Sequence, residues 1–224
     1  MLIVSSRMSD ARLAELTHQQ VPAVVVDWNI QAARQQLSAI QVDFRPGIRA
    51  AVQHLVEQGH RRFAHIGGPL TLPTSRARRD IFLQALLKSG FASKSVPVIE
   101  GDYHLEGGRD AALRLLDRAR PPTAIFAAND LMAMGALIGA RTLGWRVPAD
   151  VSIIGLDDIA LAAQTDPPLT TVAVPRYDIG VQVMQLLLGL LDHATTAPAI
   201  TRVETQLVIR QSTGPCSTAV RSAT

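Results

Sequence analysis

Polar side chains follow two apolar runs in the middle of the chain. Residues 123–128 form a short apolar run that ends at Asn129, and residues 151–155 form another that leads to Asp157 and Asp158. Apolar runs of this length, bounded by proline or polar residues, are typical of strands buried on both faces of a parallel sheet. Open α/β sheets bind ligands just beyond the carboxyl ends of their strands, so these side chains form the candidate site.

A helix is predicted directly after Asn129. Asn129 is a good N-cap, Asp130 would be a first-turn acid, and apolar residues recur at helical spacing until Gly144. Capping is the structural role we expect at this point in the chain. Asn129 could also contact a ligand in addition to capping the helix.

A second candidate is the cluster of arginines near the start of the helix predicted to begin at Thr74. Cations there oppose the positive end of the helix dipole, so an offsetting reason is expected. A planar guanidinium can bind a diol or a carboxylate through two hydrogen bonds. We favour such a role for Arg78, whereas a solvated or ion-paired position is expected for Arg76 and Arg79.

Several motifs together resemble the effector-binding core of LacI/GalR-type bacterial repressors. The resemblance extends from the first residues to about Gly214, and it is carried by residues 59–69, 100–108, 122–136, 143–158 and 167–172. It implies an α/β fold of two Rossmann-like lobes with parallel sheets, similar to type I periplasmic binding proteins. It also implies a small effector, often a sugar or a nucleobase, bound between the lobes.

The resemblance assigns ligand-binding roles to residues of the second lobe. Arg78 would hydrogen-bond the effector, Thr74 would make a polar contact at the same rim, and Asp157 would accept hydrogen bonds from the effector. Asp158 is expected to cap the short helical turn that follows it, which would leave Asp157 to face the cleft. Tyr103, just beyond a predicted strand, could stack on the ligand or simply pack.

The resemblance also points to Asp43 at the end of a short predicted strand. Asp43 could contact the ligand or cap the helix that begins near Pro46, and the two alternatives stay open. Phe44 replaces the asparagine usual in the family, and could line the pocket or pack. This departure leaves the ligand class open. Leu156 replaces the aromatic residue usual in the family, so one wall of the pocket could be wider. Val174 stands where some members carry a polar ligand contact, which argues against a heavily hydroxylated sugar.

The resemblance also predicts the domain organisation and an incomplete first lobe. We expect residues 1–69 and 175–200 in the N-terminal lobe, 70–174 and 201–214 in the C-terminal lobe, and a disordered tail at 215–224. In the family, further strand and helix units and a helix-turn-helix domain precede the point where this sequence starts. DNA binding is therefore expected only through an upstream domain absent from this chain.

Composition agrees with this class and argues against others. The chain has 224 residues, 47% hydrophobic and 18% charged, and no apolar run approaches the roughly 20 residues that cross a membrane. A net charge of +3 with scattered basic residues does not indicate nucleic-acid binding by this chain itself. With no secretion signal recognised, the cytoplasm is the expected location.

Catalysis, metal binding and a cofactor are not expected. Cys216 is the single cysteine, and the sequence lacks a nucleophile elbow, a phosphate-binding loop and a zinc-protease motif. The strongly apolar stretch Ile179–Leu191 predicts a helix that is buried or shared with a partner. Because members of the family that the chain resembles pair through both lobes, the resemblance implies a homodimer. The predicted function is the effector-sensing, dimerising core of a DNA-binding regulator; the alternative is a solute-binding protein for a sugar transporter.

Overall fold

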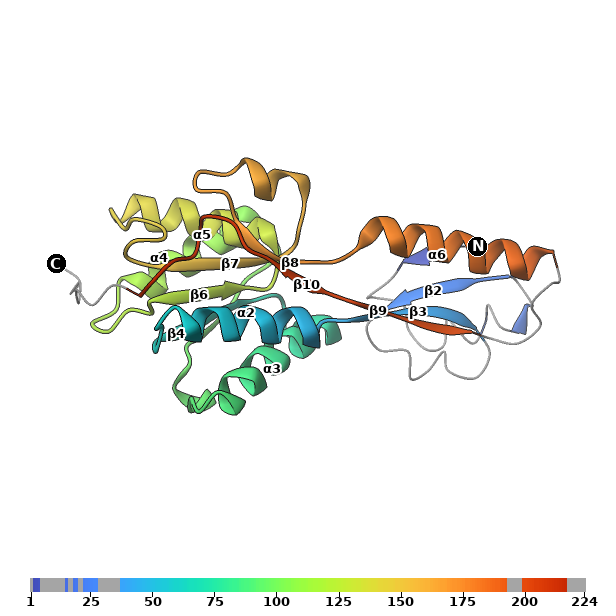
Figure 1. Cartoon of the computed structure of the whole chain (residues 1–224), viewed down its shortest axis with the longest axis horizontal. Helices are drawn as coiled ribbons and strands as arrows, with labels where there is room; N and C mark the ends of the chain where they lie inside the picture. The colour runs from blue at the N-terminus through green and yellow to red at the C-terminus, as the bar shows by residue number, and fades with distance from the viewer. Residues whose placement is uncertain are drawn as a thin grey trace. The chain divides into compact units, whose positions relative to one another are not determined.

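The computed structural model divides the chain into two compact units (Figure 1). It describes residues 2–4, 15, 18–19, 22–27, 37–192 and 199–216. Unit 1 comprises Met1–Phe44 with Pro175–Thr205, and unit 2 comprises Arg45–Val174 with Gln206–Thr224. The chain therefore passes from one unit to the other after Phe44, Val174 and Thr205.

Unit 1 contains a four-stranded sheet with the order β1-β2-β3-β9, whose neighbouring strands are parallel. Its described elements are β1 (Leu2–Val4), β2 (Val24–Asp27), β3 (Ser38–Asp43), β9 (Ile200–Glu204) and α6 (Arg176–Leu191). Helix α6 packs on β2 and β3 through Ile179 and Val183. Ser9 and Asp10 in the sequence predict the start of a further helix that runs to about Gln20, but most of these residues lie outside the described part of the chain.

Unit 2 contains a six-stranded sheet with the order β10-β8-β7-β6-β4-β5, in which only β10 runs antiparallel to its neighbour among the described strands. The strands are β4 (Phe63–Gly67), β5 (Val98–Glu100), β6 (Ala124–Ala127), β7 (Ser152–Asp157), β8 (Thr170–Ala173) and β10 (Gln206–Val208). Helices α2 (Arg45–Glu57) and α3 (Pro73–Lys88) pack together, as do α4 (Leu105–Leu116) and α5 (Asp130–Thr142). Short 3₁₀ turns, η1 (Ser93–Ser95) and η2 (Ala160–Gln164), complete the unit.

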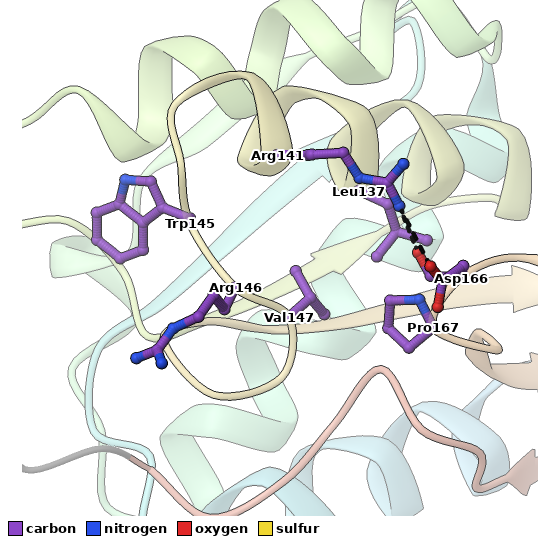
Figure 2. A pocket seen from close by; sticks show the side chains of 7 residues that line it. All are labelled: Leu137, Arg141, Trp145, Arg146, Val147, Asp166 and Pro167. Carbon is purple, nitrogen blue, oxygen red and sulfur yellow. Dashed lines mark hydrogen bonds and ion pairs between the residues drawn. The ribbon is translucent and has the colours of Figure 1, made fainter.

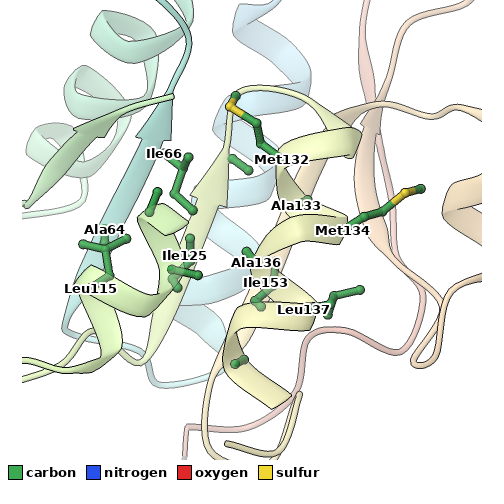
Figure 3. Packing of buried hydrophobic residues seen from close by; sticks show 14 of the residues in the cluster. Ala64, Ile66, Leu115, Ile125, Met132, Ala133, Met134, Ala136, Leu137 and Ile153 are labelled. Carbon is green, nitrogen blue, oxygen red and sulfur yellow. The ribbon is translucent and has the colours of Figure 1, made fainter. Parts of the chain in front are cut away.

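The core of unit 2 lies between the central strands and the α4–α5 pair (Figure 3). All four residues of β6 are buried, which agrees with the apolar run in the sequence. Two glycines let α4 and α5 approach closely. A Cβ at Gly135 would lie 1.9 Å from the Leu105 carbonyl oxygen, and one at Gly108 would lie 2.2 Å from that of Met132. This contact fixes α5, and with it the residues at the end of β6.

The division into units differs from the boundary predicted at residue 69. Strand β4 lies between β5 and β6 in the sheet of unit 2, so residues 45–69 belong to unit 2 rather than to the first lobe. The chain therefore enters unit 2 after Phe44, and not at residue 70 as the expected division implies. The glycines and proline after β4 mark the end of a strand, but this local signal does not reveal which sheet the strand joins.

The sequence predicts a single last strand over Glu204–Arg210, whereas the structure has two strands in this region, and they belong to two sheets. Strand β9 pairs with β3 in unit 1, whereas β10 pairs with β8 in unit 2. Between them, the backbone N–H and the hydroxyl of Thr205 donate to the Asp43 carbonyl at 3.1 and 3.0 Å. Residues 201–205 therefore lie in unit 1, contrary to the expected division.

The segment after Arg210 is anchored to unit 2 as far as Cys216. The buried His60 ring lies 3.0 Å from both the Thr123 and Ser152 hydroxyls and 3.1 Å from the Gly214 carbonyl. The Cys216 N–H donates to the Gln58 carbonyl at 2.7 Å. Residues 215 and 216, which the sequence assigned to a disordered tail, are therefore ordered, and residues 217–224 lie outside the described part of the chain.

A second histidine is buried in the aromatic core of unit 2. His65 is fully buried on β4, and its ring stacks on Phe82 and Phe126 at centroid distances of 5.3 and 5.6 Å. Its Nδ1–H donates to the Phe126 carbonyl at 2.9 Å. Burial lowers the pKa of His65 from 6.5 to about 4, because the charged ring would lose its hydration.

We expect the free energy of unfolding to fall as the pH drops from 6.5 toward 4. In this range the unfolded chain binds a proton at His65 that the folded chain excludes, so this stabilisation is complete above pH 6.5 and is lost on acidification. The loss attributable to His65 should reach about 3 kcal/mol. Urea unfolding across this range would measure it.

His65→Phe tests the assignment, because phenylalanine keeps the aromatic stack and removes the titration. The variant should show a shallower pH dependence than the unmodified chain. Replacing the exposed Leu87 by glutamine, which neither adds nor removes a titrating group, should leave the slope unchanged. An equal slope in the His65→Phe variant would contradict the assignment.

Candidate ligand-binding site

The guanidinium of Arg78 joins the ends of two strands in unit 2. Its Nη1–H donates to the Ala128 carbonyl at 2.7 Å, directly after β6. Its Nη2 lies 3.6 Å from Asp157 Oδ1 at the end of β7, and both side chains are partly shielded, with 14% and 29% of their surface exposed. The structure thus brings together Arg78 and Asp157, the two residues on which the predicted site most depends.

The neighbouring arginines of α3 make local contacts instead. Arg76 donates to the Leu70 carbonyl, and Arg79 pairs with the adjacent Asp80 at 2.7 Å. These surface contacts agree with the solvated or ion-paired position expected for both residues. Arg78 differs from them because its side chain reaches the carboxyl edge of the sheet.

Asn129 caps α5, as the sequence predicts. Its side-chain oxygen accepts the Met132 N–H at 2.9 Å, and its amide group donates to the Tyr103 carbonyl at 3.0 Å. The residue is 7% exposed. Asn129 therefore holds the loop that carries Tyr103 against the end of β6, while a direct contact with a ligand stays a prediction.

The Tyr103 ring lies over the glycine that follows β4. A Cβ at Gly68 would fall 2.2 Å from this ring, and the Tyr103 hydroxyl lies 2.7 Å from the Ser75 hydroxyl on α3. Tyr103 therefore has the packing role that the sequence allowed, and the residue as a whole is half-buried. Thr74, next to Ser75, is half-buried at the same end of α3, and its ligand contact stays a prediction.

Asp157 and Asp158 form a turn with unusual backbone geometry. Their φ angles are 121° and 54°, values that favour glycine. The Asp158 carboxylate accepts a hydrogen bond from Arg210 Nη2 at 2.7 Å, and Arg210 Nη1 donates to the Leu169 carbonyl at 2.8 Å. The predicted capping role of Asp158 is wrong, since η2 has Ile159 as its N-cap and no side-chain cap.

Sequence reasoning missed Arg210, and it missed that the Asp130 carboxylate also binds the turn after β7. The buried Asp130 carboxylate accepts the Ile159 N–H at 2.8 Å and the Thr171 hydroxyl at 2.5 Å. A Cβ at Gly155 would lie 2.2 Å from Asp130 Oδ1, so glycine leaves room for the carboxylate. Arg210 is 52 residues from Asp158, and no local pattern could connect them.

Asp43 and Phe44 belong to unit 1. Asp43 is the last residue of β3, and Phe44 is 6% exposed at the end of that unit. Their joint role with Arg78 and Asp157 of unit 2 stays a prediction.

A separate pocket of about 300 Å³ lies beside the C-terminal end of α5 (Figure 2). Its lining comprises Leu137, Arg141, Trp145, Arg146, Val147, Asp166 and Pro167. Both arginines are paired with carboxylates, Arg141 with Asp166 at 3.8 Å and Arg146 with Asp150 at 2.9 Å. The pocket contains none of the predicted site residues and presents balanced charges.

The described residues contain no cluster of three or more histidine, cysteine, aspartate or glutamate side chains placed to hold a metal ion. Within the same part of the chain, every helix is too short or too polar to cross a membrane.

Comparison with known proteins places this arrangement in a class. Residues 52–213 match the family described as periplasmic binding protein-like domain. The chain is 38% identical over 214 residues to the HTH-type transcriptional repressor CytR of Escherichia coli (strain K12), covering 95% of this chain and 62% of that protein.

Solved structures agree with this classification. The transcriptional regulator CelR–cellobiose complex is 36% identical, with a TM-score of 0.85 over 94% of this chain and 64% of that one. A regulatory protein of the LacI family from Chloroflexus aggregans is 30% identical, with a TM-score of 0.86 over 95% of this chain and 76% of that one. The chain belongs to the LacI family, and it spans about 62% of the length of curated relatives such as CytR.

The turn geometry leads to a prediction on stability. At φ 121° an alanine Cβ clashes with the backbone whereas glycine does not, so Asp157→Gly should be more stable than Asp157→Ala by about 1 kcal/mol. Both variants lose the same carboxylate, so their difference isolates the backbone. Denaturant unfolding of the pair measures it. The usual order, with alanine the more stable, would show that the strained φ is absent.

Proposed function

We propose that the chain is the effector-sensing and dimerising core of a LacI-type transcriptional regulator, with a sugar, a polyol, a nucleobase or a nucleoside as effector. The observation that carries the proposal is the pairing of Arg78 with Asp157 at the carboxyl edge of the unit 2 sheet. The related CelR structure is a complex with cellobiose, which supports a hydroxylated ligand class.

The chemistry of the paired residues fits a ligand that carries adjacent hydroxyl groups. Arg78 can donate to hydroxyl oxygens and Asp157 can accept from hydroxyl hydrogens, so adjacent hydroxyls could satisfy both. At 3.6 Å, their mutual contact is longer than a good charged hydrogen bond. Tyr103 would supply an apolar face, and Thr74 and Asn129 further polar contacts.

The regulatory part of the proposal concerns the whole protein. Asp43 and Phe44 of unit 1 would contribute to the same ligand, and occupancy would shift the population between two arrangements of the units. DNA would be read by a helix-turn-helix domain outside this chain, in the cytoplasm and without catalysis. The named relatives are regulators, so a solute-binding protein for a transporter is not favoured.

Calorimetric titration with cellobiose, ribose, polyols, nucleobases and nucleosides tests the effector role. Arg78→Met and Asp157→Asn should each weaken binding of the active compound by at least about tenfold, because each removes a charged hydrogen-bonding partner. Arg76→Met, on the same helix but exposed, is the matched control and should bind normally. Unchanged affinity in both site variants would reject the proposed site.

The dimer proposal rests on an exposed apolar stripe along α6. Tyr177, Val181, Met184, Leu188 and Leu191 are separated alternately by four and three residues, and between 39% and 84% of each is exposed. This spacing places them along one side of the helix, opposite the buried Ile179 and Val183. A continuous apolar stripe of this kind is typical of a surface covered by a partner, here a second copy of the chain.

Leu188→Glu should shift the protein from dimer to monomer in sedimentation equilibrium, because it would bury a charge in the interface. The matched control is Leu87→Glu on α3, where the leucine is similarly exposed, at 59% against 52%. The control should leave the association constant unchanged. Equal effects of the two substitutions would argue against an α6 interface.

A further inference from the structure

The Asp157–Asp158 turn is held in a conformation that the two residues would not adopt by themselves. Positive φ at a residue other than glycine is sparsely populated, and the value of 121° at Asp157 lies outside even the left-handed region that aspartate tolerates. Such backbone persists only where neighbouring groups hold it. The contacts that do so therefore determine where the Asp157 carboxylate lies.

Arg210 supplies contacts on one side of the turn. Its guanidinium donates to the Asp158 carboxylate at 2.7 Å and to the Leu169 carbonyl at 2.8 Å. Its backbone N–H donates to the Thr170 hydroxyl at 3.0 Å, which fixes the residue beside β8. The ion pair is shielded, with 20% and 28% of the side chains exposed, and the planar guanidinium fixes the direction of both hydrogen bonds.

Asp130 supplies contacts on the other side. Its buried carboxylate receives the Ile159 N–H at 2.8 Å, so the residue that follows Asp158 is fastened to the start of α5. The turn is thus held at two successive residues by partners from different parts of unit 2. Asp157, immediately before them, lies 3.6 Å from Arg78.

We propose that Arg210 is a positioning residue that holds the strained turn so that the Asp157 carboxylate faces Arg78. It would thereby set ligand affinity without touching the ligand, a consequence that rests on the proposed function. The Asp157 carbonyl also accepts the Val174 N–H at 3.5 Å, just before the chain leaves unit 2. Arg210 lies shortly after the chain re-enters at Gln206. The turn is therefore connected to two of the segments that link the units.

The positioning role can be measured without ligand by a mutant cycle on the full chain. Unfolding in urea is compared for the unmodified protein, Arg78→Met, Asp157→Asn and the double variant. The coupling between residues 78 and 157 should correspond to about a threefold effect on the unfolding equilibrium constant. In an Arg210→Met background the same cycle should give a factor of about one, because the carboxylate no longer faces the guanidinium.

Two further variants make the test specific. Arg210→Lys keeps the charge but loses the planar guanidinium that makes two hydrogen bonds, so it should retain only part of the coupling between residues 78 and 157. This variant replaces Arg210→Met in the test if the methionine variant fails to fold. Arg202→Met, an exposed arginine on β9, should leave the threefold coupling intact.

Undiminished coupling in the Arg210→Met and Arg210→Lys backgrounds would overturn the proposal, as would the absence of coupling in the unmodified protein. The outcome is distinguishable from a failure of the proposed function. If coupling depends on Arg210 but no sugar, polyol, nucleobase or nucleoside binds, the positioning role stands and the effector assignment fails. If a ligand binds, Arg210→Met should weaken its binding about as much as Asp157→Asn does.

Discussion

The candidate site depends on one constrained turn at the carboxyl end of β7. Asp157 occupies a backbone conformation that normally requires glycine, and hydrogen bonds to Asp158 and Ile159 maintain it. One comes from Arg210, the other from the buried carboxylate of Asp130. Such a conformation costs on the order of 1–3 kcal/mol. Strained backbone of this kind is typical of sites where a side chain must point in a particular direction. Here that direction brings the carboxylate to Arg78.

The rest of unit 2 provides a rigid support for this turn. Helix α5 begins at the Asn129 cap and packs on α4 through glycines that allow the two backbones to touch. Since Asp130 is the first residue of α5, the position of this helix fixes the buried carboxylate that holds Ile159. Gly155 leaves the space that this carboxylate occupies. Packing of the core and geometry of the site are thus parts of one arrangement.

Features that depend on local interactions could be predicted closely. The Asn129 cap bonds a backbone group three residues away, and the end of α5 is marked by Gly144 at φ 70°. The unfavourable position of Arg78 near a helix start indicated that its guanidinium has a partner, and the structure shows two, the Ala128 carbonyl and Asp157. The effector contact that the family resemblance implies for Arg78 stays a prediction. The role assigned to Asp158 failed for the opposite reason, since its partner Arg210 lies 52 residues away.

The sequence by itself determined the fold class, the order of most elements and the side chains that gather at the strand ends. Hydrophobic periodicity, capping residues and strand length act over a few neighbours and are readable from them. Only the tertiary structure decided that β4 joins the second sheet, that residues 200–208 divide between two sheets, and which groups hold Asp157. These outcomes depend on pairing between distant segments, whose free energies come from contacts that form only when the chain is folded.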